Sequence, residues 1–268
     1  SPKNHTYIRS PKNAHPDFYA IWADGHGRQP SQSDLYFCDK QGHVFKMPRT
    51  FDANVIKPID VTMDLNSFQI EYSPKAIGNK LGKHFVYSPH YLHGKKWIHY
   101  AEVCTWLGAL RYAQMVKDKE LIQMLKERFD RLLAKEQKYL PPKKHVDLNI
   151  FGCLALELYQ VSKDKKYLEL GLSYADSQWK LPKDANTEQK EWERKGYSWQ
   201  TRLWIDDMFM ITILQSQAYR VTGDNKYIDR TAKEMVYYLD ELQRENGMFY
   251  HAPDVPYFWA RGNGWLQG

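Results

Sequence analysis

One pattern occurs three times in the chain, and it constrains the fold more than any other feature. A helical stretch ends in an aromatic residue, a short polar turn with Asp follows, and a new helix begins. The three copies start at Tyr112, Tyr159 and Tyr219, at intervals of 47 and 60 residues. This interval is typical of repeated helical hairpins. An open solenoid would satisfy such a repeat, whereas an α/α toroid would arrange the inner helices around a central pocket.

Helical patterns are predicted from Lys95 onward. Asp in each repeated turn is a favoured N-cap for the following helix. Unusual residues recur at the N-terminal parts of alternate helices, at 97–100, 145–149 and 204–210. We therefore expect the inner helices of a toroid, with N-termini that converge on one pocket. The expected helices span residues 97–116, 119–137, 147–162, 165–180, 199–222 and 225–244, with another start near residue 259.

The first 62 residues have a different character, because they predict short strands. Residues 15–22 form an aromatic strand candidate, and residues 34–39 and 43–47 flank Lys40-Gln41-Gly42, which is a hairpin signal. So few strands are not stable alone. They either pack on the helical part or end a larger β-domain. Residues 63–96 contain several Gly and Pro and are expected to form a linker.

Composition and charge narrow the class of protein. The net charge of +6 is spread over mixed patches such as Lys143-Lys144, which favours a solvated surface and argues against nucleic-acid binding. Three distant cysteines give neither zinc spacing nor a disulfide framework. No apolar run is long enough for a membrane span. Because the chain starts at Ser1 without Met, we expect that a leader or a whole upstream domain was removed. We expect the protein to be periplasmic or secreted, with the cytoplasm as the other option.

Two adjacent acids, Asp206 and Asp207, stand in the apolar helical stretch Trp204-Ile-Asp-Asp-Met-Phe-Met210. Carboxylates are almost never fully buried unless they are paired. Neighbouring helix positions point about 100° apart, so both acids cannot share one narrow exposed face. A surface pair of acids is the alternative interpretation. The apolar neighbours favour a cavity in which one of the acids uses its charge or its proton.

Further polar residues in two segments suit a sugar site. Asp147 follows His145, and an ordinary N-cap is the other interpretation of this Asp. The tail contains His251 and then Trp259-Ala-Arg261-Gly-Asn-Gly-Trp265, which we interpret as a tight turn that lets backbone approach a ligand; an ordinary loop leading into a helix is the alternative. Acids, one His, one Arg and several Trp together suit binding and protonation of a carboxylated sugar.

The stretches at 204–210 and 259–265 resemble motifs of the unsaturated glucuronyl and rhamnogalacturonyl hydrolases, glycoside hydrolase families 88 and 105, with a closer likeness to family 105. The resemblance covers residues from about 95 to 268. It implies a mainly α fold, an (α/α)6 toroid preceded here by a short β segment. Such a toroid needs about twice the helical length present, so we expect residues 97–268 to be the N-terminal part of an incomplete barrel.

The resemblance also assigns site residues. It gives Asp206 as the catalytic acid by position and Asp147 as the second acid. Asp207 stands where the family often has Gly and is expected to bind substrate, and the sequence leaves open which of Asp206 and Asp207 is the pocket acid. The other expected substrate-binding residues are His251, Arg261, Trp265, Trp204, Tyr100 and Trp97. No metal or other cofactor is implied. A weaker resemblance relates residues 17–48 to the end of a sialidase-type β-propeller, which would be fused upstream of the hydrolase.

The activity implied is removal of a 4,5-unsaturated uronic acid from the non-reducing end of an oligosaccharide made by a lyase. Asp206 would protonate the vinyl ether, which requires a raised pKa. Two other functions remain open. An inverting glycosidase on a similar toroid would act on saturated glycosides, with acids about 6.5–9.5 Å apart. A glycan-binding protein without catalysis would keep its affinity when Asp206 is changed to Asn. Neither a nucleic-acid partner nor a membrane is expected.

Overall fold

The computed structural model describes residues 73–265 and, for three short strands nearer the N-terminus, the backbone alone. These strands are β1 (Phe18–Ala23), β2 (Leu35–Asp39) and β3 (Val44–Met47), which form an antiparallel sheet in the order β1-β2-β3. Cys38 pairs with Val44 in the β2–β3 hairpin, so the hairpin predicted around residues 40–42 is confirmed. The turn itself and the proposed propeller lie outside the described residues, and the propeller stays a prediction.

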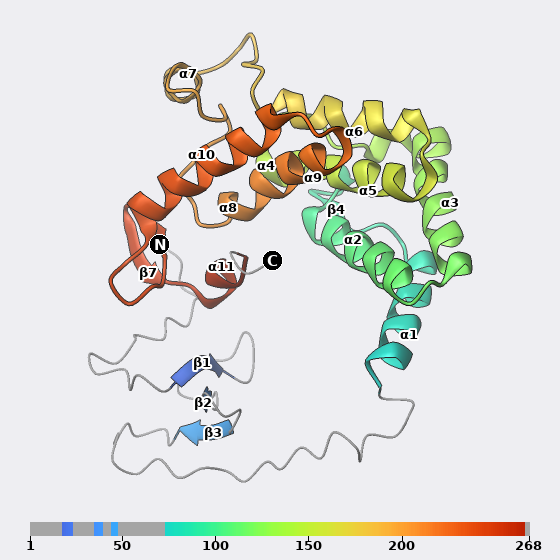
Figure 1. The fold of residues 1–268 in the computed structure, drawn as a ribbon, viewed down its shortest axis with the longest axis horizontal. Coiled ribbons are helices and arrows are strands. Elements are labelled where there is room, and N and C mark those ends of the chain that lie inside the picture. Colours follow the sequence, from blue (N-terminus) through green and yellow to red (C-terminus); the bar gives the residue numbers. More distant parts are fainter. Residues whose placement is uncertain (1–17, 24–34, 40–43, 48–72, 266–268) are drawn as a thin grey trace.

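Helices make up most of the rest, and they form pairs that follow one another around an arc (Figure 1). Inner helices α2, α5 and α9 contact one another in this order, and each packs against the outer helix that follows it in the chain. The inner helices are α2 (Tyr100–Met115), α5 (Gly152–Ser162) and α9 (Thr212–Thr222). The outer ones are α3 (Lys119–Lys135), α6 (Lys165–Ser177) and α10 (Asn225–Leu242). This arrangement of inner and outer helices is the expected α/α toroid type of fold.

The three repeated turns join each inner helix to its outer partner in the same way. A residue in the left-handed conformation ends each inner helix region: Lys117, Lys163 and Gly223, with φ of 58°, 58° and 69°. An Asp then caps the outer helix by accepting a hydrogen bond from a backbone N–H. These caps are Asp118, Asp164 and Asp224. The N-caps predicted from the repeat are therefore confirmed.

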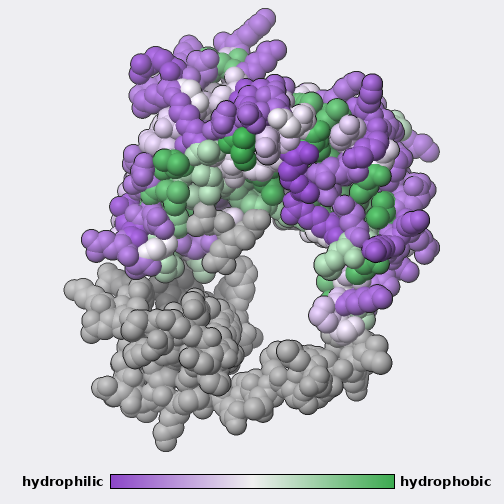
Figure 2. Space-filling view, in the orientation of Figure 1, coloured by the Kyte–Doolittle hydropathy of each residue, from purple (hydrophilic) through white to green (hydrophobic). Residues whose placement is uncertain are grey.

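The core lies between the inner and outer helices and is rich in aromatic rings. Phe129 of α3 contacts Trp106, Phe151 and Tyr167 at centroid distances of 5.6, 5.4 and 5.8 Å. All four side chains are fully buried. The outer side of the helices is mainly hydrophilic (Figure 2). Burying aromatic rings of this size gives the hairpin repeat its stability, because each ring removes a large apolar area from water.

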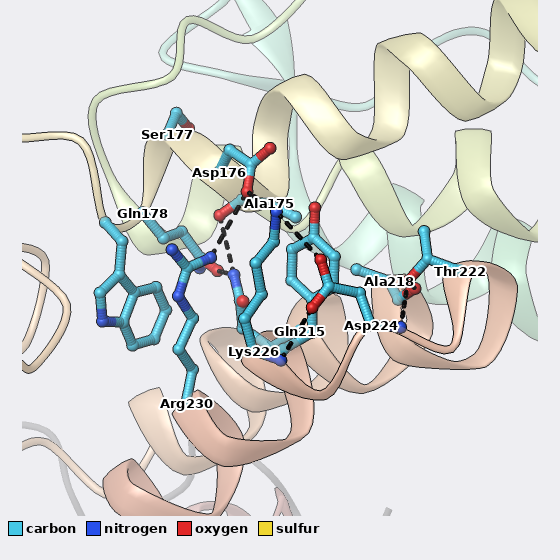
Figure 3. A network of polar contacts seen from close by, with 12 residues as sticks. Ala175, Asp176, Ser177, Gln178, Gln215, Ala218, Thr222, Asp224, Lys226 and Arg230 are labelled. Carbon is cyan, nitrogen blue, oxygen red and sulfur yellow. Dashed lines mark hydrogen bonds and ion pairs between the residues drawn. The ribbon is translucent and has the colours of Figure 1, made fainter.

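Polar contacts also join successive hairpins (Figure 3). Gln215 of α9 donates hydrogen bonds to the Ala175 carbonyl and to Gln178, each at 2.8 Å. Near the surface, Asp176 lies 3.4 Å from Arg230 and 3.8 Å from Lys226, both on α10. The buried amide contacts contribute more than the exposed ion pairs, which are worth at most about 1 kcal/mol each.

Several elements differ from the sequence-based expectation. Helix α1 (Pro74–Tyr87) and strand β4 (Leu92–His93) occupy the expected linker, and β5 (Trp97–Ile98) replaces the expected start of α2. The helix expected at 147–162 is divided into α4 (Val146–Asn149) and α5. In the longest loop, α7 (Thr187–Arg194) was not expected.

The connections from outer to inner helices are long and varied, in contrast to the repeated turns. The first contains the β4–β5 hairpin, and the fourth contains β6 (Tyr250–Ala252) and β7 (Val255–Phe258), which lead into α11 (Ala260–Trp265). Because they precede the inner helices, all of them lie at the N-terminal ends of those helices, which we call the site end. None of the helices that the structure describes is long and apolar enough to cross a membrane.

Candidate active site

Asp206 immediately precedes α8 (Asp207–Met210) and is its N-cap residue, but its side chain makes no capping hydrogen bond. The carboxyl group is 16% exposed, and its Oδ2 atom is buried without a hydrogen-bond partner among the described residues. Burial raises the pKa of Asp206, and the negative charge of Asp207 acts in the same direction. This carboxyl group is therefore free to exchange a proton with a ligand.

Asp207 lies in the opposite environment, although it is the next residue. Its side chain is fully buried and accepts hydrogen bonds from Arg202 Nη2 at 2.5 Å, Arg202 Nε at 3.1 Å and Tyr238 Oη at 2.9 Å. Burial raises the pKa of Asp207, while the Arg202 guanidinium lowers it. With these donors filling its oxygens, Asp207 does not line the pocket, which differs from the expectation that it contacts substrate.

Residues 198–206 form a loop, where the sequence predicts helix. Leu203 has φ +57°, a strained conformation for a residue with a branched side chain. Two side chains of helix α10 hold this loop. Tyr238 accepts a hydrogen bond from the Leu203 N–H at 3.2 Å. Glu234 accepts one from the Ser198 N–H at 2.6 Å and another from the Thr201 hydroxyl. These contacts direct Trp204 and Asp206 toward the site.

Asp147 is brought to the same place by the start of α4. His145 caps this helix by accepting from the Asp147 N–H at 3.2 Å, so Asp147 is not the cap. The Asp147 carboxylate is 23% exposed and lies 3.8 Å from Arg202 Nη2, and His145 Nε2 lies 3.3 Å from Arg202 Nη1. Arg202 thus connects Asp147 with the buried Asp207. Burial lowers the pKa of His145, which favours its neutral form.

His251 lies beside Asp206 between two indole rings. Its Nδ1 atom is 3.8 Å from Asp206 Oδ2, and its ring is 5.3 Å from Trp204 and 5.0 Å from Trp259 between centroids. Burial lowers the pKa of His251. Arg261 is exposed, and its guanidinium stacks on Trp259 at 4.1 Å. These residues surround Asp206 with hydrogen-bonding groups and flat apolar faces, as a sugar site requires.

The remaining predicted residues lie on the inner side of the arc. Trp265 contacts Phe209 at 4.9 Å and Tyr100 at 6.3 Å, and it borders a cavity of ≈ 280 Å³ that Arg111 also lines. Trp97 is half-buried on β5, at the start of α2. The structure therefore forms two groups of predicted residues. Tyr100 and Trp265 lie together on one side, and Asp206, His251, Trp204 and Arg261 lie on the other. Arg202 connects Asp147 with Asp207, which is the residue after Asp206.

The Arg-Gly-Asn-Gly segment forms the helix α11 rather than the expected tight turn. A Cβ atom on Gly262 would lie 2.5 Å from an Ile205 methyl group, so this glycine allows α11 to pack against the residue before Asp206. Asn263 exchanges hydrogen bonds with the backbone of Phe249, at 2.9 and 3.0 Å. The segment thus fixes the position of Asp206 and of the strand that carries His251.

Sequence reasoning missed three residues that shape the site: Arg202, Glu234 and Tyr238. An Arg four residues before the acidic pair was the one available signal for Arg202. The other two lie on an outer helix, and nothing in their local sequence relates them to the loop. Among residues 73–265, no three His, Cys, Asp or Glu side chains are grouped so as to hold a metal ion.

The chain matches a family model and a curated relative. Residues 75–268 match the family model described as Glycosyl Hydrolase Family 88. The chain is 22% identical over 258 residues to the unsaturated 3S-rhamnoglycuronyl hydrolase of Alteromonas sp. (strain LOR), an alignment that covers 82% of this chain. The chain spans 59% of the length of that relative.

A family 76 glycoside hydrolase from a bovine Bacteroides thetaiotaomicron strain is a similar solved structure. It has a TM-score of 0.42 and 14% identity, and the match covers 63% of this chain and 43% of that one. This likeness is too limited to assign any residue of the site. The family model, in contrast, matches most of the chain and includes both segments on which the resemblance rested. The chain belongs to Glycosyl Hydrolase Family 88.

Proposed function

We propose that the protein removes a 4,5-unsaturated uronyl residue from the non-reducing end of an oligosaccharide, with Asp206 as the acid. The observation that carries this proposal is the carboxyl group of Asp206, whose Oδ2 atom is buried without a hydrogen-bond partner in the described part of the chain and whose pKa is raised by burial. A general acid must hold its proton until the substrate arrives, and a raised pKa favours that state. Family membership and the name of the Alteromonas relative support the substrate class.

The reaction begins at the double bond and not at the anomeric carbon. Asp206 donates its proton to C4, and positive charge develops at C5, where the ring oxygen stabilises it. Water adds to C5 and returns a proton to Asp206, so the acid is regenerated. The resulting hemiketal opens to a ketone at C5, and the C1 hemiacetal then releases the remaining sugar. The net change consumes one water molecule.

The surrounding residues have roles that follow from their positions. Asp147 orients the attacking water or a sugar hydroxyl, and Arg202 fixes Asp147 through the 3.8 Å contact. His251 is 3.8 Å from Asp206 and contacts the same sugar. Arg261 binds the uronate carboxylate, since a guanidinium is the side chain best suited to bidentate recognition of that group. Trp204 provides an apolar face for the ring.

The experiment compares unsaturated oligosaccharides, prepared by lyase digestion of several uronate-containing polysaccharides, with their saturated counterparts. The ultraviolet absorbance of the double bond conjugated to the carboxylate reports the proposed reaction. Loss of this absorbance on the unsaturated substrates, with no release of sugar from the saturated ones, supports the proposal. Release of saturated uronate would favour an inverting glycosidase instead. Binding without any turnover would favour a glycan-binding function.

A further inference from the structure

Two adjacent connections at the site end carry positive charge without any carboxylate. The β4–β5 hairpin contains Lys95 and Lys96, and the loop before α4 contains Lys143 and Lys144. No Asp or Glu occurs in residues 91–101 or 137–146. The other two connections at this end, before α8 and before β6, mix both signs. From sequence, Lys143 and Lys144 are expected to be part of a solvated surface. In the structure, Lys143 lies over Tyr174, whereas Lys144 lies beside another aromatic ring, which Lys96 also approaches.

That ring is Trp97, which lies between the two connections. Lys144 Nζ is 4.9 Å from its ring centroid and Lys96 Nζ is 5.9 Å away. The position of Trp97 is fixed by its pairing with His93 in the hairpin. Both lysines are exposed, and neither has an ion-pair partner among residues 73–265. In contrast, Lys126 on α3 lies 2.8 Å from Asp130.

The two ammonium groups therefore have only a weak partner. A cation over an aromatic ring at an exposed site is only weakly stabilised. A charge-assisted hydrogen bond to an anion is the stronger interaction. An anionic group at this position would accept hydrogen bonds from both ammonium groups. The indole would provide an apolar face for the sugar that carries the anionic group.

The pair of lysines also lies next to the proposed catalytic site. His145 follows Lys144 in the chain and lies 3.3 Å from Arg202, which contacts Asp147. On the hairpin side, His93 stacks on His99, the N-cap residue of α2, at 5.6 Å. A sugar bonded to the unsaturated uronate would extend from the Asp206 region across these residues.

We infer that Lys96, Lys144 and Trp97 form a second subsite, which binds an anionic sugar adjacent to the uronyl residue that is removed. The chemistry required is a compact negative group, either a sulfate ester or a carboxylate. This inference rests on the proposed function for its place in the reaction. It adds that the enzyme selects the charge of the sugar that it releases.

The test is the double variant Lys96→Gln/Lys144→Gln in the full chain. KM is measured for unsaturated disaccharides whose second sugar is neutral, sulfated or carboxylated. We expect the preference for a charged over a neutral second sugar to fall about tenfold, and to fall in the wild type when salt is added, because these charges are exposed. A difference between the sulfated and carboxylated substrates identifies the natural group. The control, Lys119→Gln/Lys165→Gln, removes two exposed lysines at the opposite ends of the helices.

Two results would overturn the inference. One is an unchanged preference in the double variant, and the other is an equal loss in the control. A separate binding measurement, by calorimetry with saturated sulfated and carboxylated oligosaccharides, does not depend on turnover. If no unsaturated substrate is consumed but charged oligosaccharides bind the wild type more tightly than the double variant, the proposed function fails while the subsite stands. Equal binding to both proteins rejects the subsite.

Discussion

The two ends of the same helix pairs differ sharply in this molecule. At one end, which we call the turn end, three short turns share the same structure: a residue in the left-handed conformation followed by an Asp that caps the next helix. At the site end, each connection has its own length and structure, and together they carry Asp147, Trp204, Asp206 and His251. Repetition at one end fixes the spacing of the helices. The other end is thereby free to vary, and it contains the buried Asp207 and the strained backbone at Leu203.

The site end depends on hydrogen bonds from its loop to the outer helix α10. Asp207, Tyr238 and Glu234 hold the loop before Asp206 by accepting hydrogen bonds from its residues. Strained backbone such as that at Leu203 persists only where the surroundings over-determine it. The site end should therefore respond strongly to changes in buried residues that touch no substrate, while the turn end should respond weakly and locally.

The largest expected effect on stability at the site end comes from Arg202→Met. This change leaves the Asp207 carboxylate fully buried without its guanidinium partner, which costs about 3–5 kcal/mol. Urea unfolding measures the loss. Adding Asp207→Asn should recover part of it, because the buried charge is then gone. The exposed Arg194→Met on α7 is the control. Equal stability of Arg202→Met and the control would contradict the supporting role.

Glu234→Gln tests how the second side chain that holds the loop, Glu234, changes the stability of the protein with pH. Burial raises the pKa of Glu234 from 4.5 to about 7, so the folded state loses stability as pH rises from about 4.5 to about 7, while the unfolded chain is already ionised. Gln carries no such penalty. The stability of the variant relative to wild type should increase across this window, by at most about 3.5 kcal/mol at about 1.4 kcal/mol per pH unit. Thermal unfolding at pH 5 and pH 8 measures it, and a difference that does not change with pH would refute the prediction.

Gly262→Ala should move α11 away from the residues before α8. The added methyl group would lie 2.5 Å from Ile205 and 2.8 Å from Trp259, and overpacking of this kind costs about 1–3 kcal/mol. Gly264→Ala in the same helix is a matched control, since nothing lies within 4 Å of its added atom. Denaturation curves of the two variants measure the cost. If Gly262→Ala were as stable as Gly264→Ala, the packing reason for the Gly would be wrong.

The smallest effect belongs to the turn end. Asp164→Ala removes the side-chain cap of α6, an acceptor for the Lys166 N–H at 3.0 Å, and should cost about 1 kcal/mol of stability. Glu169→Ala, an exposed change on the same helix, is the control. Activity should be unchanged in both, because the turn lies at the far end of the helices. A loss of turnover in folded Asp164→Ala protein would show that the two ends are coupled.

The turn end was predictable because its signals are local. Asp118, Asp164 and Asp224 each cap a helix that starts with the following residue, so a short stretch of sequence contains the whole interaction. The site end was predictable only in part. Asp206 and His251 were found through their apolar and aromatic neighbours, and the structure places them 3.8 Å apart.

Long-range contacts account for the errors. The apolar spacing of residues 199–206 favours a helix, but hydrogen bonds that the loop donates to Tyr238 and Glu234 hold this segment as a loop. Gly262 and Gly264 suggest a tight turn, yet the first is required by the proximity of Ile205 and the second is unconstrained. Both errors arise because tertiary contacts override a local preference.

The most direct test of the central claim compares Asp206→Asn with Asp207→Asn in the full-length protein. Turnover of an unsaturated uronyl disaccharide is measured per folded molecule, alongside the melting temperature. We expect Asp206→Asn to lose about 10²–10⁴ in kcat with its fold intact, as is typical of the loss of a general acid. Asp207→Asn should lose stability but keep most of its activity while folded. Full activity of Asp206→Asn, with inactivation of well-folded Asp207→Asn, would contradict the account.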